Sequence, residues 1–243
     1  MRHWKISLFT MFLVLSSGAQ AAPAPVYAYP TLEHMIDFMF ANGYVDPNNV
    51  DQLSQYVMIK DCKLFKDYYR NDFTWNKIKT RIINEQKSLQ KDVVNHFILP
   101  VNFTITRYNF KTMAFDLAEN SQLKNVNHLQ LFKGEPLSCD RNAITRKSDV
   151  LPLHYDLTFD TPVSLYRLPM AQNMAQQILP GLPNRPQDAL QQRLVYASIY
   201  LTVDSVLGIT GADAVLLGRL DKIDFFLDQS RTQKIKTLWY SDL

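Results

Sequence analysis

The sequence has few cysteines and few glycines: two cysteines and seven glycines among 243 residues. So few glycines argue against long flexible linkers and against glycine-rich loops that bind phosphate. Catalytic motifs are missing too, because the sequence contains no GxSxG, no HExxH, no GxGxxG after a strand and no GxxxxGKS/T. Motifs therefore identify no catalytic residue and no cofactor-binding residue.

Histidines and acidic residues do not occur at the spacing of a metal site. After residue 21 the histidines are separate from one another: His34, His96, His128 and His154. A separate histidine is more often solvated or structural than a metal ligand. Three acidic residues near the C-terminus carry oxygens that suit calcium, namely Asp221, Asp224 and Asp228. Because the EF-hand spacing and its glycine are absent, we expect no metal site.

The overall charge is close to neutral. The chain has 26 basic and 23 acidic residues, and removing residues 1–21 would take away Arg2 and Lys5, leaving 24 basic against 23 acidic. A protein whose main partner is nucleic acid would need a strong basic excess, so we expect no nucleic-acid partner. Hydrophobic residues make up 47% and charged residues 20%, which is typical of a globular protein.

Residues 1–21 have the pattern of a signal peptide. Arg2 and Lys5 precede a short apolar run, and Ala19 and Ala21 form a small-residue cleavage site. We expect cleavage after Ala21 and a periplasmic or secreted protein of a bacterium. A retained anchor is the alternative, but the apolar run is shorter than the roughly 20 residues that span a bilayer. No other segment is long and apolar enough, so we expect no integral membrane segment after cleavage.

The two cysteines, Cys62 and Cys139, are too far apart for a CxxC motif. In an oxidising compartment, an even number of cysteines indicates a disulfide bond. We predict a Cys62–Cys139 bridge that ties the end of the second helix to the polar loop 134–150. On the chain-entropy model, such a bridge stabilises by about 4.5 kcal/mol. Two separate thiols are the alternative.

Helical patterns come first in the chain and strand patterns follow. Three helices are predicted: one from Thr31 to about Asn42, one beginning at Asp46-Pro47, and one beginning at Asp72 and ending near Pro100. The strand patterns are 101–117, HLQLF, two strands around Thr161-Pro162, 193–209, 215–228 and 234–240, with a short helix at 171–179.

This order predicts an α+β fold, with N-terminal helices packed on a mainly antiparallel sheet. We expect residues 22–243 to form a single domain, with a helical part at about 31–98 and a sheet part at about 101–240.

Aromatic residues gather where the second and third helices meet. The cluster consists of Phe65, Tyr68, Tyr69, Phe73 and Trp75 and stands beside Lys63, Lys66 and Arg70. It could form a surface that binds sugar or peptide, with Tyr68, Tyr69 and Trp75 as its contact residues. Alternatively, these aromatic side chains pack inward as part of the core.

The same region resembles a known family. Cys62, then Asp72-Phe73, Trp75 and Ile78, then the strand Arg107-Tyr108-Asn109-Phe110, are similar to the pattern of a family of exported bacterial proteins with a domain of unknown function. The resemblance implies a periplasmic location. It implies no activity and no catalytic residues.

Two functions are consistent with the sequence. The first is a non-enzymatic interaction or binding module of the cell envelope, whose partner is an envelope protein or polymer. The alternative is a hydrolase of an envelope polymer in which dispersed acids such as Asp156, Asp160 or Asp204 act as general acid and base. Glycoside hydrolysis would need two carboxylates about 5 to 9.5 Å apart.

Overall fold

The computed structural model describes residues 25–135, 150–182 and 193–242. Within these ranges the α-helices are α1 (Leu32–Ala41), α2 (Val50–Lys60), α3 (Cys62–Tyr68), α4 (Asp72–Asp92) and α5 (Gln172–Ile178). The strands are β1 (His96–Asn109), β2 (Ala114–Leu117), β3 (Leu123–Lys133), β4 (His154–Leu165), β5 (Arg167–Pro169), β6 (Arg193–Thr210), β7 (Asp213–Phe226) and β8 (Lys234–Trp239).

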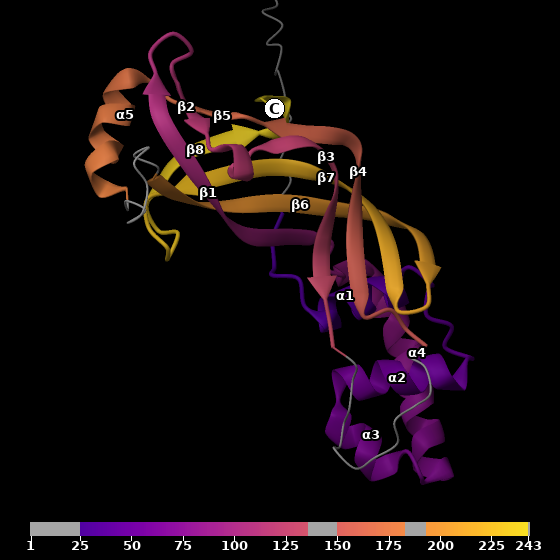
Figure 1. The fold of residues 1–243 in the computed structure, drawn as a ribbon. Helices are drawn as coiled ribbons and strands as arrows, with labels where there is room; N and C mark the ends of the chain where they lie inside the picture. Colours follow the sequence, from indigo (N-terminus) through magenta and orange to yellow (C-terminus); the bar gives the residue numbers. More distant parts are fainter. Residues whose placement is uncertain (1–24, 136–149, 183–192, 243) are drawn as a thin grey trace, which may run out of the picture.

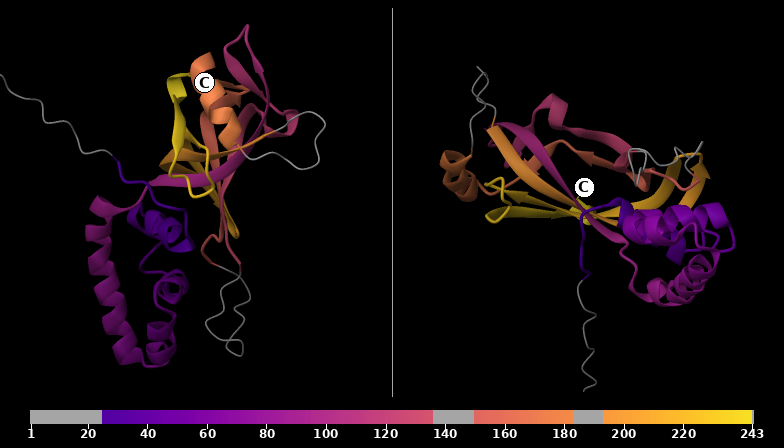
Figure 2. Two further views of the ribbon diagram at one scale, coloured as in Figure 1. Left: turned by 90° about the vertical axis from the view of Figure 1, so that its left-hand side faces the viewer. Right: turned by 90° about the horizontal axis from the view of Figure 1, so that it is seen from below.

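The strands form one curled sheet, and the helices lie at its two ends (Figure 1). Helix α1 lies against one end, α2, α3 and α4 extend beyond it as a helical lobe, and α5 lies at the opposite end (Figures 1 and 2). The α+β class and the mainly antiparallel sheet are confirmed. The helices do not pack on the sheet as expected. Helices α2–α4 pack mainly against one another and do not cover the faces of the sheet.

Strand β7 organises the sheet, which runs in the order β3-β4-β7-β6-β1-β2-β5 with β8 also paired to β7. One edge of β7 pairs with β6 along most of its length. The other edge is shared: residues 213–218 pair in parallel with β4, and residues 222–226 pair with β8. Strand β4 leaves β7 where β8 joins it. The chain then continues into β5, which pairs with β2, and the sheet curls around the apolar core.

The helix caps are local and mostly explain the helix boundaries. Thr31 accepts a hydrogen bond from the backbone N–H of His34 and starts α1 as predicted. The second predicted helix is instead two helices, because Asp61 ends α2 and its side chain accepts from the N–H of Leu64 to start α3. Cys62 therefore begins α3 rather than lying near the end of a longer helix.

The third helix is shorter than the sequence indicated. It ends at Asp92, and β1 begins at His96, where a helix reaching nearly to Pro100 was predicted. The residues from His96 to Ile105 pair one for one with β6, and Phe97 is fully buried opposite Leu201. Pairing with a central strand outweighs the helical periodicity of this short apolar stretch.

Strand β4 passes through Pro162 without a break, whereas two separate strands were predicted there. The last residue of β4 paired with β7 is Phe159, and pairing with β3 resumes at Val163. Pro162 thus lies where β4 has left one neighbour and bulges from the other. A proline in such a position removes no ladder hydrogen bond.

Gln55 of α2 connects the helical lobe to the sheet. Its side-chain oxygen accepts hydrogen bonds from the backbone N–H groups of Val150 and Leu151, at 2.7 and 2.9 Å, just before β4. Gln55 is 2% exposed, so this contact is made in the interior. It fixes the entry of β4 against α2.

Several predictions fall outside the described residues. The signal peptide with its cleavage site at Ala21, and the second cysteine, Cys139, are among them. The Cys62–Cys139 bridge therefore stays a prediction. No helix within the described ranges has both the length and the hydropathy to cross a bilayer.

Gly218 permits the close approach of β6 and β4 to the centre of β7. A Cβ atom at this position would lie 2.3 Å from the backbone oxygen of Thr202 and 2.7 Å from Cδ1 of Leu157. The first neighbour is backbone and cannot rotate away. Gly208, in the same hairpin, has no atom within 4 Å of the corresponding position.

We therefore expect Gly218→Ala to lower the free energy of unfolding by about 1–3 kcal/mol, because β6 must shift to make room. Gly208→Ala is the matched control and should stay within about 0.5 kcal/mol of the parent chain. Urea denaturation followed by circular dichroism measures both. Equal midpoints for the two variants would contradict the packing described here.

Candidate functional site

The outward face of β1, β6, β7 and β8 carries a connected network of polar and aromatic side chains. Along β6 the alternate residues Val195, Ala197, Ile199, Leu201 and Val203 point into the core. The residues between them point outward: Tyr196, Ser198, Tyr200, Thr202 and Asp204. Ser198 and Thr202 are nevertheless only 2% exposed.

Asp221 is the first centre of this network. Its Oδ2 accepts hydrogen bonds from the hydroxyls of Tyr27 and Thr202, at 3.0 and 2.6 Å. Arg219 places its Nε 3.6 Å from Oδ1, and Nδ1 of His96 lies 2.8 Å from the Thr202 hydroxyl oxygen. Burial, followed by the Asp221 carboxylate, raises the pKa of Tyr27 to about 12. Tyr27 thus stays a neutral donor at physiological pH.

Asp224 is the second centre, and it is 3% exposed. Its Oδ1 accepts from the Thr237 hydroxyl at 2.5 Å, and its Oδ2 lies 3.0 Å from Nζ of Lys222 and 3.7 Å from Nζ of Lys234. Burial alone would raise the pKa of Asp224, but the hydrogen bonds from Thr237 and Lys222 outweigh it, and the net shift is downward. Asp224 is therefore a charged, fully partnered carboxylate.

Three aromatic rings cross the same face, and we call Tyr27, Tyr200 and Trp239 the aromatic row. The rings of Tyr27 and Tyr200 meet edge to face, with centroids 4.8 Å apart. Nζ of Lys222 lies 4.2 Å from the centroid of the Tyr200 ring and 5.6 Å from that of Trp239, so this cation joins the two rings. Trp239 is 56% exposed, and Tyr29, on the N-terminal segment, is 58% exposed.

The network does not present its histidine-bonded hydroxyl as a nucleophile. The Thr202 hydroxyl is the one hydroxyl bonded to a histidine in the network, yet Thr202 is buried and its proton is directed to Asp221. A nucleophile needs both an available lone pair and access to substrate. The carboxylates of Asp221 and Asp224 are each held by several donors, whereas the Trp239 ring is open to solvent.

The three acids of the hydrolase hypothesis are divided between two strands. Asp156 and Asp160 belong to β4 and Asp204 to β6, with β7 between the two strands. Arg219 of β7 forms an ion pair with Asp204. Neither pocket described below is lined by any of these three acids. The structure thus does not bring them together at a cleft.

The three acids near the C-terminus whose oxygens suit calcium also have separate partners. Asp221 and Asp224 are engaged as described above. Asp228 caps the loop between β7 and β8, accepting from the backbone N–H groups of Thr232 and Gln233 at distances from 2.7 to 3.1 Å. Within the described residues, no group of three or more histidine, cysteine, aspartate or glutamate side chains could hold a metal ion.

The predicted surface of Tyr68, Tyr69 and Trp75 is partly core. The Trp75 ring packs against those of Phe65 and Tyr69, with centroids 5.9 and 5.5 Å away, and Trp75 is 5% exposed. Trp75 thus belongs to the interior of the helical lobe, as the alternative interpretation held. The exposed aromatics at this corner are Tyr68, at 40%, and Phe73, at 86%.

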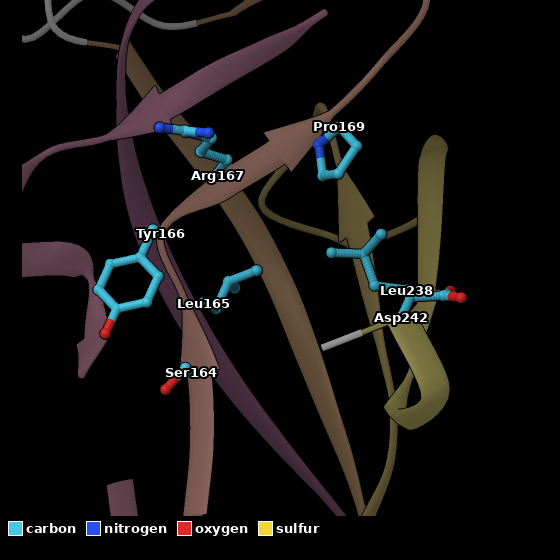
Figure 3. A pocket seen from close by; sticks show the side chains of 7 residues that line it. All are labelled: Ser164, Leu165, Tyr166, Arg167, Pro169, Leu238 and Asp242. Carbon is cyan, nitrogen blue, oxygen red and sulfur yellow. The ribbon is translucent and has the colours of Figure 1, made fainter. Parts of the chain in front are cut away.

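A pocket of about 330 Å³ lies in the slot where the sheet does not close, between β4–β5 and β8 (Figure 3). Leu165 and Leu238 face each other across it, while Tyr166 and Arg167 point away from Leu238 (Figure 3). Asp242 at the rim accepts a hydrogen bond from the backbone N–H of Trp239. A second pocket of about 400 Å³ lies beside Asn42 and Gln90. Neither has the convergent polar groups of a typical ligand site.

Sequence reasoning missed the outward network because it depends on strand register. The alternation of tyrosine, serine and threonine on one side of residues 196–202 was its only local signal. The partners come from distant segments: Tyr27 lies 194 positions from Asp221.

The amino-acid sequence of this α+β chain matches the model of a protein family. Residues 49–180 match the family described as Domain of unknown function (DUF4852), and the chain therefore belongs to that family. The match includes α2–α5 and β1–β5 and ends before β6. No curated protein and no solved structure matched the chain in the comparisons.

We expect Asp224→Asn to lower the free energy of unfolding by about 2 kcal/mol at neutral pH, because Lys222 loses its charged partner. The pKa of Asp224 is lowered in the folded state, so its contribution is present above the unfolded value near 4 and is lost as pH falls through the folded pKa. The difference in free energy of unfolding between parent and variant should therefore be smaller at about pH 3 than at about pH 7.

Denaturation at the two pH values measures this gap. Asp160→Asn is the control, because Asp160 is an exposed aspartate of the same sheet, and it should change stability by less than about 0.5 kcal/mol. A gap that is constant with pH would show that the Asp224 carboxylate does not titrate as described.

Proposed function

We propose that this protein is a non-enzymatic binding module of the bacterial cell envelope, acting in the periplasm or after secretion once residues 1–21 are removed. Its contact surface is the aromatic row, and its ligand is an envelope polymer with sugar units. The observation that carries this proposal is the contrast on one face of the sheet: the acids are internally partnered, while Trp239 remains 56% exposed.

The chemistry of the face suits a glycan. Aromatic rings present a large, rigid apolar surface that can stack on the apolar faces of sugars, while tyrosine hydroxyls supply polar contacts. The charges in the middle of the face pair with one another, as in Lys222 with Asp224 and Arg219 with Asp221. A locally neutral, aromatic surface favours an uncharged stretch of polymer over a strongly charged ligand.

Hydrolysis of the same polymer is the less supported alternative. It would require one of the outward acids to act as a general acid or base within reach of a bound substrate. The ion pair between Asp204 and Arg219, and the separation of β4 from β6 by β7, both count against it.

Binding is tested with protein-free cell-wall polymer by co-sedimentation. We expect Trp239→Ala to weaken binding about tenfold, the loss of an aromatic anchor worth about 1.4 kcal/mol. Phe110→Ala is the control, because Phe110 is also exposed, at 67%, but lies in the turn after β1. A parent chain that stays in the supernatant, or equal sedimentation of the two variants, would refute the binding proposal. Release of soluble sugar by the parent chain would support the hydrolase instead.

Export is tested separately by intact mass of the protein recovered from the periplasm or medium. We expect a chain that begins at Ala22 and, after denaturation without reductant, takes up no alkylating reagent, because Cys62 and Cys139 are bridged. Reduction should then expose two thiols per chain. A full-length chain retained in the cytoplasm would contradict export, and two reactive thiols before reduction would contradict the bridge.

A further inference from the structure

The corner between α3 and α4 combines positive charge with an exposed aromatic side chain. Residues 62–81 contain six basic residues, Lys63, Lys66, Arg70, Lys77, Lys79 and Arg81, against two acidic ones, Asp67 and Asp72. This segment has a formal charge of +4, while the whole chain has +3, so the remaining residues sum to −1. The excess of positive charge is thus concentrated in this part of the helical lobe.

Phe73 is the most conspicuous side chain of this corner. It is 86% exposed, and Tyr68, at the end of α3, is 40% exposed. Figures 1 and 2 place the corner at the end of the helical lobe farthest from the sheet. Core packing does not require an exposed phenylalanine here, because Trp75 and Ile78 already bury the inner side of α4.

Three exposed cations belong to the same α3–α4 segment as Phe73. Lys63, Arg70 and Lys77 are exposed. Lys77 lies one turn after Phe73 on the side of α4 opposite Trp75, so the ring and the ammonium group are neighbours on the outer surface. Arg81, a turn further along, is paired with Glu85 at 3.5 Å. The corner itself therefore offers exposed positive charge next to an apolar ring.

We propose that this corner, defined by Lys63, Tyr68, Arg70, Phe73 and Lys77, docks on the surface of an anionic phospholipid bilayer. Cations near a membrane surface are attracted by acidic headgroups, and aromatic side chains settle at the boundary between headgroups and acyl chains. The corner projects at the end of the lobe, and Phe73 stands out from it. Such a shape fits a flat, deformable surface, whereas a protein partner would need a matching pocket for the ring. The contact is peripheral and reversible, since only three cations and two aromatic rings supply it.

The test is co-sedimentation of the processed chain with vesicles of phosphatidylcholine alone and with vesicles in which phosphatidylglycerol makes up about a third of the lipid. We expect binding to the anionic vesicles, at least tenfold weaker binding to the neutral ones, and loss of binding at about 1 M salt, where charges are screened within a few ångströms. Phe73→Ser, and separately Lys63→Glu with Arg70→Glu, should each weaken binding about tenfold.

The matched control is Phe110→Ser with Lys111→Glu, an exposed aromatic and an exposed lysine in the turn after β1. It should bind anionic vesicles as the parent chain does, and so should Trp239→Ala, which separates this surface from the glycan-binding face. Equal denaturation midpoints would show that the exposed substitutions leave the fold intact. Equal binding to both vesicle types, or corner variants that bind like the parent, would overturn the proposal. Binding to poly-glutamate without binding to vesicles would overturn it in favour of an acidic protein partner.

Discussion

The close contact of β6 with β7 at Gly218 is the constraint on which the rest of the structure depends. There the backbone oxygen of Thr202 lies where a side chain would otherwise begin. The close approach lets β7 pair with β6 on one side and divide its other edge between β4 and β8. The curl of the sheet and the slot beside β8 follow from that division.

The outward face shows how a sheet of this kind buries polar groups. Thr202 and Asp224 are almost fully covered, which would be costly without partners. Each is satisfied by a group from another strand, Thr202 by Asp221 and Asp224 by Thr237, and Lys222 of the same strand is a second partner of Asp224. Because the partners are on different strands, the network also fixes the register of β6, β7 and β8. The aromatic row lies over this network and is held in place by it.

The sequence predicted what depends on local patterns and failed where distant contacts decide. The start of α1 at Thr31 and the long strand β6 follow from capping and alternation, and both are confirmed. The stretch from Val93 to Ile98 has a helical pattern too, but pairing with β6 makes it a strand from His96 onward. Pro162 suggested a break between strands, yet the sheet provides a position where its missing N–H is harmless.

The candidate site was harder to predict than the fold for the same reason. Trp75 was a candidate for the surface on composition alone, and only the packing of the lobe shows that it is buried while Phe73 is exposed. No spacing in the sequence relates Tyr27 to Tyr200 or Lys222 to Trp239. These neighbours arise from the register of β6 to β8 and from the N-terminal segment, which joins β1 at Ala28.

The two proposed surfaces would reinforce each other in one molecule. The aromatic row lies on the sheet, and the α3–α4 corner lies at the far end of the lobe, so both can be occupied at once (Figure 1). Each proposed contact would be weak by itself, but the second ligand would be met at a high effective concentration once the first is bound. The gain depends on a stiff connection between the surfaces. The hydrogen bonds of Gln55 to Val150 and Leu151 provide one, because they hold α2 against the entry of β4. A chain built in this way would link a polymer to a membrane surface without needing high affinity for either.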